Sequence, residues 1–369
     1  LAACTSSKPG DSAAGVPDEL DAPDEPGPWV VGHGVDALQD IGEPGRTLPI
    51  DLWYPVTPGD ESASAPTEYL LQGVFALPSP LAYEDAPGAG LDAPLLVFSH
   101  GYRSIHTQST SLMEALASHG FVVVSVGHTG NTQDDPSDDF ETAASRRVPD
   151  IAAVIDWAST GAGATRLAGQ VDAETVGVLG HSFGGMTTLG VGAGWAGTAG
   201  LPEVDALMPI SAVVDADLQE DDRPSESAGF SEAELATITQ PTLLLGGTLD
   251  TNVPVENNGL AFDWMTGAES VLRVDIIGAT HTHFANVCDI GDLLIGLGLA
   301  MDAWEGLGAG DLVAPYTTTC TGDAFPIAEA VRLQNLYAVA HFRRHLLGEE
   351  GYAWWLSADG AAEEAAVEL

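Results

Sequence analysis

The segment 180–185, GHSFGG, has the clearest chemical potential because it contains the pattern G-x-S-x-G. The aliphatic run 175–179 precedes it and is typical of a buried strand, while the small apolar run 186–191 can begin a helix. In such a strand–turn–helix context the pattern projects a serine hydroxyl from the carboxyl edge of a sheet. We therefore expect Ser182 to be a nucleophile, the alternative being a plain turn in a chain with 43 glycines.

A seryl hydroxyl attacks a carbonyl group only with the help of a base that takes its proton and an acid that orients the base. Asp250 follows the apolar run 241–246, and His281 follows the alternating run 270–277. The carboxyl ends of neighbouring parallel strands meet at one edge of a sheet. We therefore expect Asp250 as the acid and His281 as the base, both within reach of Ser182.

An oxyanion hole is the next requirement, because negative charge develops on the carbonyl oxygen in the transition state. The expected strand 94–99 ends in His100-Gly101-Tyr102, and the turn after it can aim a backbone N–H at that oxygen. We assign one donor to the N–H of Tyr102 and the other to the N–H of Phe183. The loss of one such donor typically costs about 3–4 kcal/mol of transition-state stabilisation.

These motifs together resemble bacterial α/β-hydrolases related to platelet-activating-factor acetylhydrolase, a group that includes predicted dienelactone hydrolases. They are also similar to cutinase-like polyester hydrolases. The matching segments keep the order of that family along the chain: GRTLPIDLWYP (45–55), LLVFSHGY (95–102), LASHGFVVVSVGHTGNTQDD (116–135), GVLGHSFGG (177–185), PTLLLGGTLDTNVP (241–254) and GATHTHFANVC (278–288).

The resemblance implies an α/β-hydrolase fold with Ser182 as nucleophile, Asp250 as acid and His281 as base. Dienelactone hydrolases use a cysteine nucleophile, so the serine here argues against that chemistry. The pattern G-A-x-H falls on His281, but His283 remains open as the base. The pattern L-D-T-x-x-P around Asp250 matches the polyester hydrolases and favours Asp250 as the acid. In eukaryotic acetylhydrolases the acid follows an earlier strand, and Asp215 has that position here, so Asp215 also remains open.

The apolar and polar patterns predict one α/β catalytic domain over residues 28–369, in which a mostly parallel central sheet carries helices on both faces. Strands are expected near 48–54, 94–99, 121–126, 175–179, 206–214, 241–246 and 270–277. Helices are expected near 108–119, 147–158, 183–192, 257–266 and 326–347. The segment 289–325 is rich in glycine and carries no predicted element.

The composition of the chain limits which macromolecules and surfaces it can bind. The chain has 54 acidic and 11 basic residues and a net charge of −43, which repels nucleic acids and anionic membranes. His281 and His283 are two residues apart with no third ligand in view, so no metal is expected. The proposed chemistry needs no cofactor.

The first residues, Leu1-Ala2-Ala3-Cys4, resemble a lipobox, in which the cysteine of a bacterial lipoprotein becomes lipidated. We therefore expect residues 1–27 to be a lipidated terminus with a flexible linker. The protein would be extracytoplasmic and would contact a membrane only through the anchor at Cys4. In an oxidising compartment, the remaining Cys288 and Cys320 can form a disulfide.

These expectations predict a serine carboxylic-ester hydrolase that acts through an acyl-enzyme on short-acyl esters. The resemblance adds polyesters and acetylated phospholipids as further substrates. The rival hypothesis is a lipoprotein that binds a ligand on a hydrolase fold without catalysis.

Overall fold

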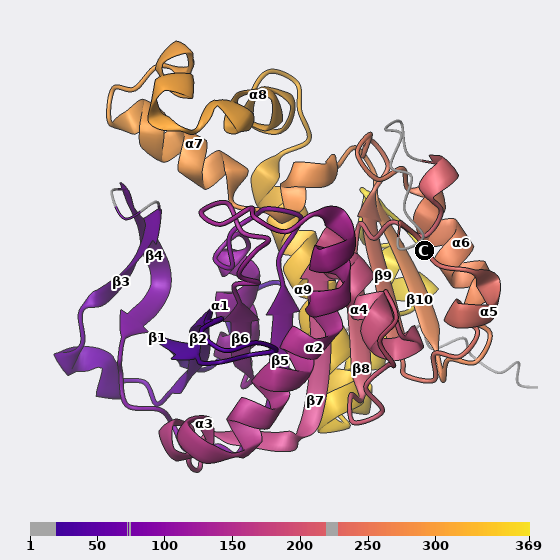
Figure 1. Ribbon diagram of the computed structural model, residues 1–369, viewed down its shortest axis with the longest axis horizontal. Coiled ribbons are helices and arrows are strands. Elements are labelled where there is room, and N and C mark those ends of the chain that lie inside the picture. Colours follow the sequence, from indigo (N-terminus) through magenta and orange to yellow (C-terminus); the bar gives the residue numbers. More distant parts are fainter. Residues whose placement is uncertain (1–19, 72, 74, 219–227) are drawn as a thin grey trace, which may run out of the picture.

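In the computed structural model, which describes residues 20–71, 73, 75–218 and 228–369, an 11-stranded sheet runs through the molecule (Figure 1). Its order is β11-β10-β9-β8-β7-β5-β6-β2-β1-β4-β3. The strands are β1 Val30–Leu38, β2 Leu48–Val56, β3 Pro66–Leu71, β4 Phe75–Glu84, β5 Ala93–Ser99, β6 Val122–Val126, β7 Val171–His181, β8 Ala206–Ile210, β9 Thr242–Gly247, β10 Val271–Ile276 and β11 Val367–Glu368.

From β10 to β6 the neighbouring strands of the sheet are parallel, whereas β2, β3 and β11 pair antiparallel with their neighbours. The α-helices are α1 Thr110–Ser118, α2 Phe140–Ser159, α3 Gly161–Arg166, α4 Phe183–Ala193, α5 Glu232–Leu235, α6 Glu256–Trp264, α7 Val287–Gly296, α8 Val313–Cys320, α9 Ile327–Leu347 and α10 Ala358–Ala361. The 3₁₀ helices are η1 Asp60–Ala63, η2 Ala216–Leu218, η3 His281–Phe284, η4 Met301–Ala303, η5 Glu305–Leu307, η6 Gly310–Leu312 and η7 Glu350–Trp354.

The central strands are buried on both faces, so their sequences are continuous apolar runs rather than alternating ones. Leu95 and Val97 of β5 pack into a core with α2 and α4, whereas Leu96 and Phe98 of the same strand pack into a core with α1 and α9. Successive side chains of a strand point to opposite faces, so helices cover both sides of the sheet. The predicted fold class is confirmed.

All seven predicted strands are present, and each predicted helix overlaps one in the structure. Helix α2 begins at Phe140, earlier than the predicted 147. The side chain of Asp139 accepts a hydrogen bond from the N–H of Thr142 and caps its N-terminus. Apolar periodicity is weak in this first polar turn, which explains the difference. Among the described residues no helix combines the length and apolarity that a membrane span requires.

The linker predicted for residues 1–27 is wrong over the part that the structure describes. The N–H of Gly27 donates to Ser118, and the carbonyl of Asp21 accepts from the hydroxyl of Tyr352. Asp24 forms an ion pair with Arg332 of α9. Residues 20–27 are therefore attached to the domain. Cys4, the predicted lipidation residue, lies outside the described residues, and its lipidation stays a prediction.

Residues 287–320 form a cap that stands apart from the sheet, and its helices α7 and α8 lie at the top of Figure 1. Its own small core is formed by Val287, Leu294, Trp304 and Tyr316. Sequence periodicity did not reveal this element, because 3₁₀ turns and glycines interrupt its short helices.

Candidate active site

The turn between β7 and α4 places Ser182 in a backbone conformation that residues with a Cβ rarely adopt, with φ 59° and ψ −117°. The flanking glycines are needed for this turn. A Cβ on Gly184 would lie 1.8 Å from the carbonyl oxygen of Ser99, and one on Gly180 would lie 2.4 Å from the carbonyl oxygen of Gly184. The strained turn and the close approach of strand and helix agree with the expected geometry of a nucleophile.

Asp250 and His281 form a hydrogen-bonded pair, with 2.7 Å between Oδ2 of Asp250 and Nδ1 of His281. The other carboxylate oxygen accepts from the N–H groups of Asn252 and Val253 at 2.9 and 2.8 Å. Burial raises the pKa of Asp250, but His281 and the N–H of Val253 outweigh burial and hold that pKa below its ordinary value. The ionised carboxylate orients the ring so that Nε2 remains for the serine.

Ser182 and His281 line the same cavity. The hydrogen bonds of the described residues include none between the Ser182 hydroxyl and Nε2 of His281. Hydrogen bonds of this kind are often long or poorly aligned without substrate and tighten when it binds. The structure therefore places Ser182 and His281 in one cavity without a hydrogen bond between them.

The two alternative residues have other contacts. His283 is buried, its Nδ1 accepts from the N–H of Thr280 at 2.8 Å, and its Nε2 donates to the carbonyl of Phe325 at 3.0 Å. Asp215 accepts from the N–H of Asp217 at 2.9 Å, whereas Asp250 lies 2.7 Å from Nδ1 of His281. Both ring nitrogens of His283 are occupied, so this geometry favours His281 and Asp250.

The predicted oxyanion donors, Tyr102 and Phe183, lie side by side. Their rings are 5.2 Å apart, and both residues line the cavity with Ser182. The N–H of Phe183 is the first of helix α4, so it has no partner within the helix. Within the described part of the chain, the N–H of neither residue donates a hydrogen bond to another protein group. Both are therefore available to a substrate carbonyl.

Gln108, which the sequence analysis missed, connects three segments of the site. Its side-chain oxygen accepts from the N–H of Gly101 at 2.8 Å, and its NH₂ group lies 3.0 Å from Nδ1 of His181. Nε2 of His181 then donates to the carbonyl of His281 at 3.0 Å. Burial and the neighbouring His281 lower the pKa of His181 to about 3, so this histidine is neutral. No pattern in the sequence identifies Gln108, because its partners are distant along the chain.

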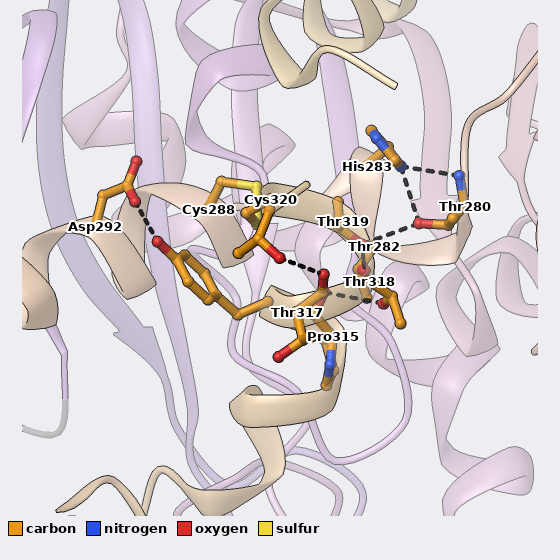
Figure 2. Close-up of a disulfide and its surroundings, with 12 residues drawn as sticks. Thr280, Thr282, His283, Cys288, Asp292, Pro315, Thr317, Thr318, Thr319 and Cys320 are labelled. Carbon is orange, nitrogen blue, oxygen red and sulfur yellow. Dashed lines mark hydrogen bonds between the residues drawn. A yellow bond between two sulfur atoms is a disulfide. The ribbon is translucent and has the colours of Figure 1, made fainter. Parts of the chain in front are cut away.

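A disulfide joins Cys288 to Cys320, as predicted, and Figure 2 shows how this bridge reaches the loop of His281. Thr319 precedes Cys320. Its hydroxyl lies 2.9 Å from that of Thr280 and 2.5 Å from that of Thr282. The residues on either side of His281 are therefore attached to the end of the bridged cap.

The cavity has a volume of about 1010 Å³ and three walls. Loops at the carboxyl edge of the sheet carry the catalytic candidates, while strands β3 and β4 and the cap supply most of the apolar lining. The apolar side chains from these two walls are Tyr69, Leu70, Leu71, Phe75, Val287, Ile290, Leu294, Ala309, Leu312 and Pro315. In the part of the chain that the structure describes, no group of His, Cys, Asp or Glu side chains has the arrangement of a metal site.

One part of the cavity lining is polar. Asp51 lies 2.7 Å from Nε2 of His33 and 2.6 Å from Nε2 of His106, and Nδ1 of His33 lies 3.3 Å from Glu84. Burial raises the pKa of Asp51, but the two histidines outweigh it and lower that pKa to about 2. Burial lowers the pKa of His33, but the carboxylates of Asp51 and Glu84 outweigh it and raise that pKa. Both of its ring nitrogens face carboxylates, which favours the protonated form of His33.

Comparisons with known proteins agree with this architecture. The family model described as Chlorophyllase matches residues 72–248. Cutinase est1 of Thermobifida alba is 29% identical over 187 residues, 50% of this chain and 52% of that protein. A cutinase of Thermobifida fusca (strain YX) is 26% identical over 187 residues, again 50% of this chain and 52% of that protein. The chain therefore spans about half the length of the curated relatives it matches.

Among solved structures, a ferulic acid esterase from Streptomyces cinnamoneus superposes with a TM-score of 0.62 at 23% identity, covering 87% of this chain and 91% of that chain. The cutinases support the cutinase-like part of the predicted resemblance. The likeness to acetylhydrolases and dienelactone hydrolases stays a prediction. The sheet order, the serine turn and this superposition show that the chain has the α/β-hydrolase fold.

Proposed function

We propose that this protein is a serine hydrolase of carboxylic esters. One observation carries the proposal: His281, which is hydrogen-bonded to Asp250, lines a cavity together with Ser182, whose backbone is held in a strained turn. The cutinases and the ferulic acid esterase to which the chain is similar are esterases by name, which supports the same reaction class.

In the proposed reaction, His281 takes the proton of Ser182 as the hydroxyl oxygen attacks the ester carbonyl carbon. Negative charge then develops on the carbonyl oxygen, and the N–H groups of Tyr102 and Phe183 bind that oxygen. The imidazolium of His281, stabilised by Asp250, gives its proton to the departing alcohol, and an ester bond to Ser182 remains.

Water completes the cycle. His281 takes a proton from a water molecule as its oxygen attacks the acyl-enzyme, and the same proton returns to Ser182 when the acid leaves. The protein residues supply every proton transfer, so the proposal includes no cofactor.

The proposed substrates are short-acyl esters. Polyesters are the second candidate, favoured by the likeness to cutinases and by the apolar lining of the large cavity. Acetylated phospholipids rest on the resemblance seen in the sequence alone. The proposal includes an extracytoplasmic location and a lipid anchor, which stay predictions.

A fluorophosphonate probe separates the esterase from a non-catalytic ligand-binding protein. The esterase should be labelled and should hydrolyse p-nitrophenyl esters, with turnover falling as the acyl chain is lengthened from acetate to palmitate. A protein that binds these esters but is neither labelled nor active would contradict the proposal. Release of soluble acids from a polyester film tests the second candidate.

A further inference from the structure

The carbonyl group of Gly101 is held from two sides. NH2 of Arg147 donates to it at 3.2 Å, and Nδ1 of His100 lies 2.7 Å from it. The N–H of His128 donates to Nε2 of His100 at 3.2 Å, so Nε2 is the unprotonated nitrogen and Nδ1 carries the hydrogen. The carbonyl therefore accepts two hydrogen bonds, both from buried side chains.

This carbonyl belongs to the peptide unit whose N–H is that of Tyr102. The described chain contains no cis peptide, and in a planar trans peptide the C=O and N–H groups point in opposite directions. Hydrogen bonds that fix the carbonyl of Gly101 on the protein side therefore aim the N–H of Tyr102 away from Arg147. Tyr102 lines the cavity, so this direction leads toward the substrate.

Arg147 also contacts the residue that carries the second oxyanion donor. Its guanidinium carbon lies 4.7 Å from the ring centroid of Phe183. The same guanidinium donates to the carbonyl of His100 and to Asn131, both at 2.6 Å. A planar group with several fixed donors can hold all of these partners at once, which a lysine ammonium cannot do with the same geometry.

Arg147 belongs to a buried cluster with Arg46 and Asp150, in which two basic side chains share one carboxylate. Burial lowers the pKa of Arg147 to about 9, so its guanidinium is still positively charged at neutral pH. Arg46 is also positively charged, and Asp150 accepts from it at 2.6 and 2.8 Å. Burial and the charge of Arg147 lower the pKa of His100 and His128 well below the ordinary value, so both are neutral. A positive charge in a low-dielectric interior favours the oxyanion.

We propose that Arg147 is a positioning residue for the oxyanion hole: it fixes the Gly101–Tyr102 peptide and places its guanidinium group behind it. This inference rests on the proposed esterase function. It differs from a purely structural role because it predicts a selective loss of transition-state binding.

The test compares Arg147→Lys with Arg343→Lys. Arg343 is a matched control on α9, because it also donates to a backbone carbonyl, that of His119 at 2.7 Å, and lies over an aromatic ring, that of Tyr352 at 5.2 Å. Turnover of p-nitrophenyl acetate should fall about 10- to 100-fold in Arg147→Lys, with KM within about threefold of wild type. Arg343→Lys should keep the wild-type turnover.

A trifluoromethyl ketone, which forms a tetrahedral adduct with the serine, should bind Arg147→Lys more weakly by the same factor as kcat/KM falls. Binding of acetamide, an uncharged analogue of the substrate acyl group, should change by less than about threefold. Wild-type turnover in folded Arg147→Lys would overturn the proposal. The proposal would also be overturned if the fraction of enzyme that a fluorophosphonate labels fell by the same factor as turnover.

A second pair of variants applies if Arg147→Lys does not fold. In His100→Asn the side-chain NH₂ group can replace Nδ1 as donor to Gly101, whereas His100→Leu has no donor. Turnover should therefore be lower in His100→Leu than in His100→Asn, and equal turnover in the two would overturn the proposal. A wild-type protein that takes no fluorophosphonate label contradicts the esterase function itself, which separates that failure from a failure of this inference.

Discussion

Nδ1 of His281 lies 2.7 Å from Oδ2 of Asp250, and that carboxylate is held on its other side by two backbone N–H groups. A histidine fixed in this way keeps one tautomer and one orientation. The ring can then accept a proton at Nε2 while the carboxylate stabilises the resulting imidazolium.

Asp250→Asn should lower turnover by about 10³- to 10⁴-fold, because an amide does not stabilise the imidazolium and favours the wrong tautomer. Steady-state kinetics with p-nitrophenyl acetate measure this effect. Asp215→Asn is the control, and its turnover should stay within about tenfold of wild type. The reverse ranking of the two variants would move the acid to Asp215.

His281→Ala and His283→Ala should differ in kind. Removal of His281 should lower turnover by at least about 10³-fold. Removal of His283 should leave turnover within about tenfold but should lower the free energy of unfolding by about 1–3 kcal/mol, since the N–H of Thr280 and the carbonyl of Phe325 lose their buried partner. Kinetics and urea unfolding of both variants provide the measurement. A larger turnover loss in His283→Ala would identify it as the base.

These two predictions test the acid and the base that were assigned from the sequence. The serine turn, the acid and the base all follow predicted strands, and each such strand carries its chemistry at the carboxyl end, where local sequence is informative. The glycines at 180 and 184 reveal a close backbone approach that no other residue allows.

Other parts of the site could not be predicted from the sequence. Gln108 and Arg147 act through hydrogen bonds to residues far away along the chain, so their types and spacing carry no signal. The cap was missed because its short helices are stabilised by their own small core and by the disulfide rather than by an amphipathic period. Strands β1, β3 and β4 widen the sheet beyond the predicted elements and supply part of the cavity wall.

The cap should be coupled to the base through Thr319. Thr319→Val keeps the shape of the side chain but removes the hydroxyl that contacts Thr280 and Thr282. Turnover should fall several-fold with little change in KM, because a misplaced base slows the chemical step. Thr318→Val is the neighbouring control, since that exposed hydroxyl bonds only to carbonyls of its own helix.

Loss of the disulfide in Cys288→Ser with Cys320→Ser should lower the free energy of unfolding by about 2–4 kcal/mol and the melting temperature by several degrees. It should also reduce turnover at 25 °C more than apparent substrate affinity. An unchanged turnover number in both this variant and Thr319→Val would leave the cap with a structural role only.

The Asp51 carboxylate should make stability depend on acidity. Its pKa is lowered from 3.8 to about 2 in the folded protein, so it stabilises the fold above pH 3.8 and loses this effect as the pH falls toward 2. The shift corresponds to about 2 kcal/mol. Urea unfolding of Asp51→Asn and wild type should therefore differ most near pH 5 and progressively less below pH 4.

The contribution of His33 to the stability of the fold depends on pH in the opposite direction. Its pKa is raised above 6.5, so its stabilisation is complete below pH 6.5 and is lost as the pH rises through the folded value. Asp302 is exposed, and Asp302→Asn serves as the control. Its free energy of unfolding should differ from that of wild type by the same amount at every pH. If the free energy of unfolding differs between wild type and Asp51→Asn by the same amount from pH 2 to 6, this account of Asp51 is refuted.

The most direct test of the central claim is the site and the consequence of covalent labelling at Ser182. Wild-type protein treated with a fluorophosphonate should gain the mass of one adduct, peptide mapping should place that adduct on Ser182, and ester hydrolysis should stop in proportion. Ser182→Ala should take no label and should lose turnover by about 10⁴-fold or more. An adduct on another residue, or near-wild-type turnover in Ser182→Ala, would contradict the proposal that Ser182 is the nucleophile of a serine esterase.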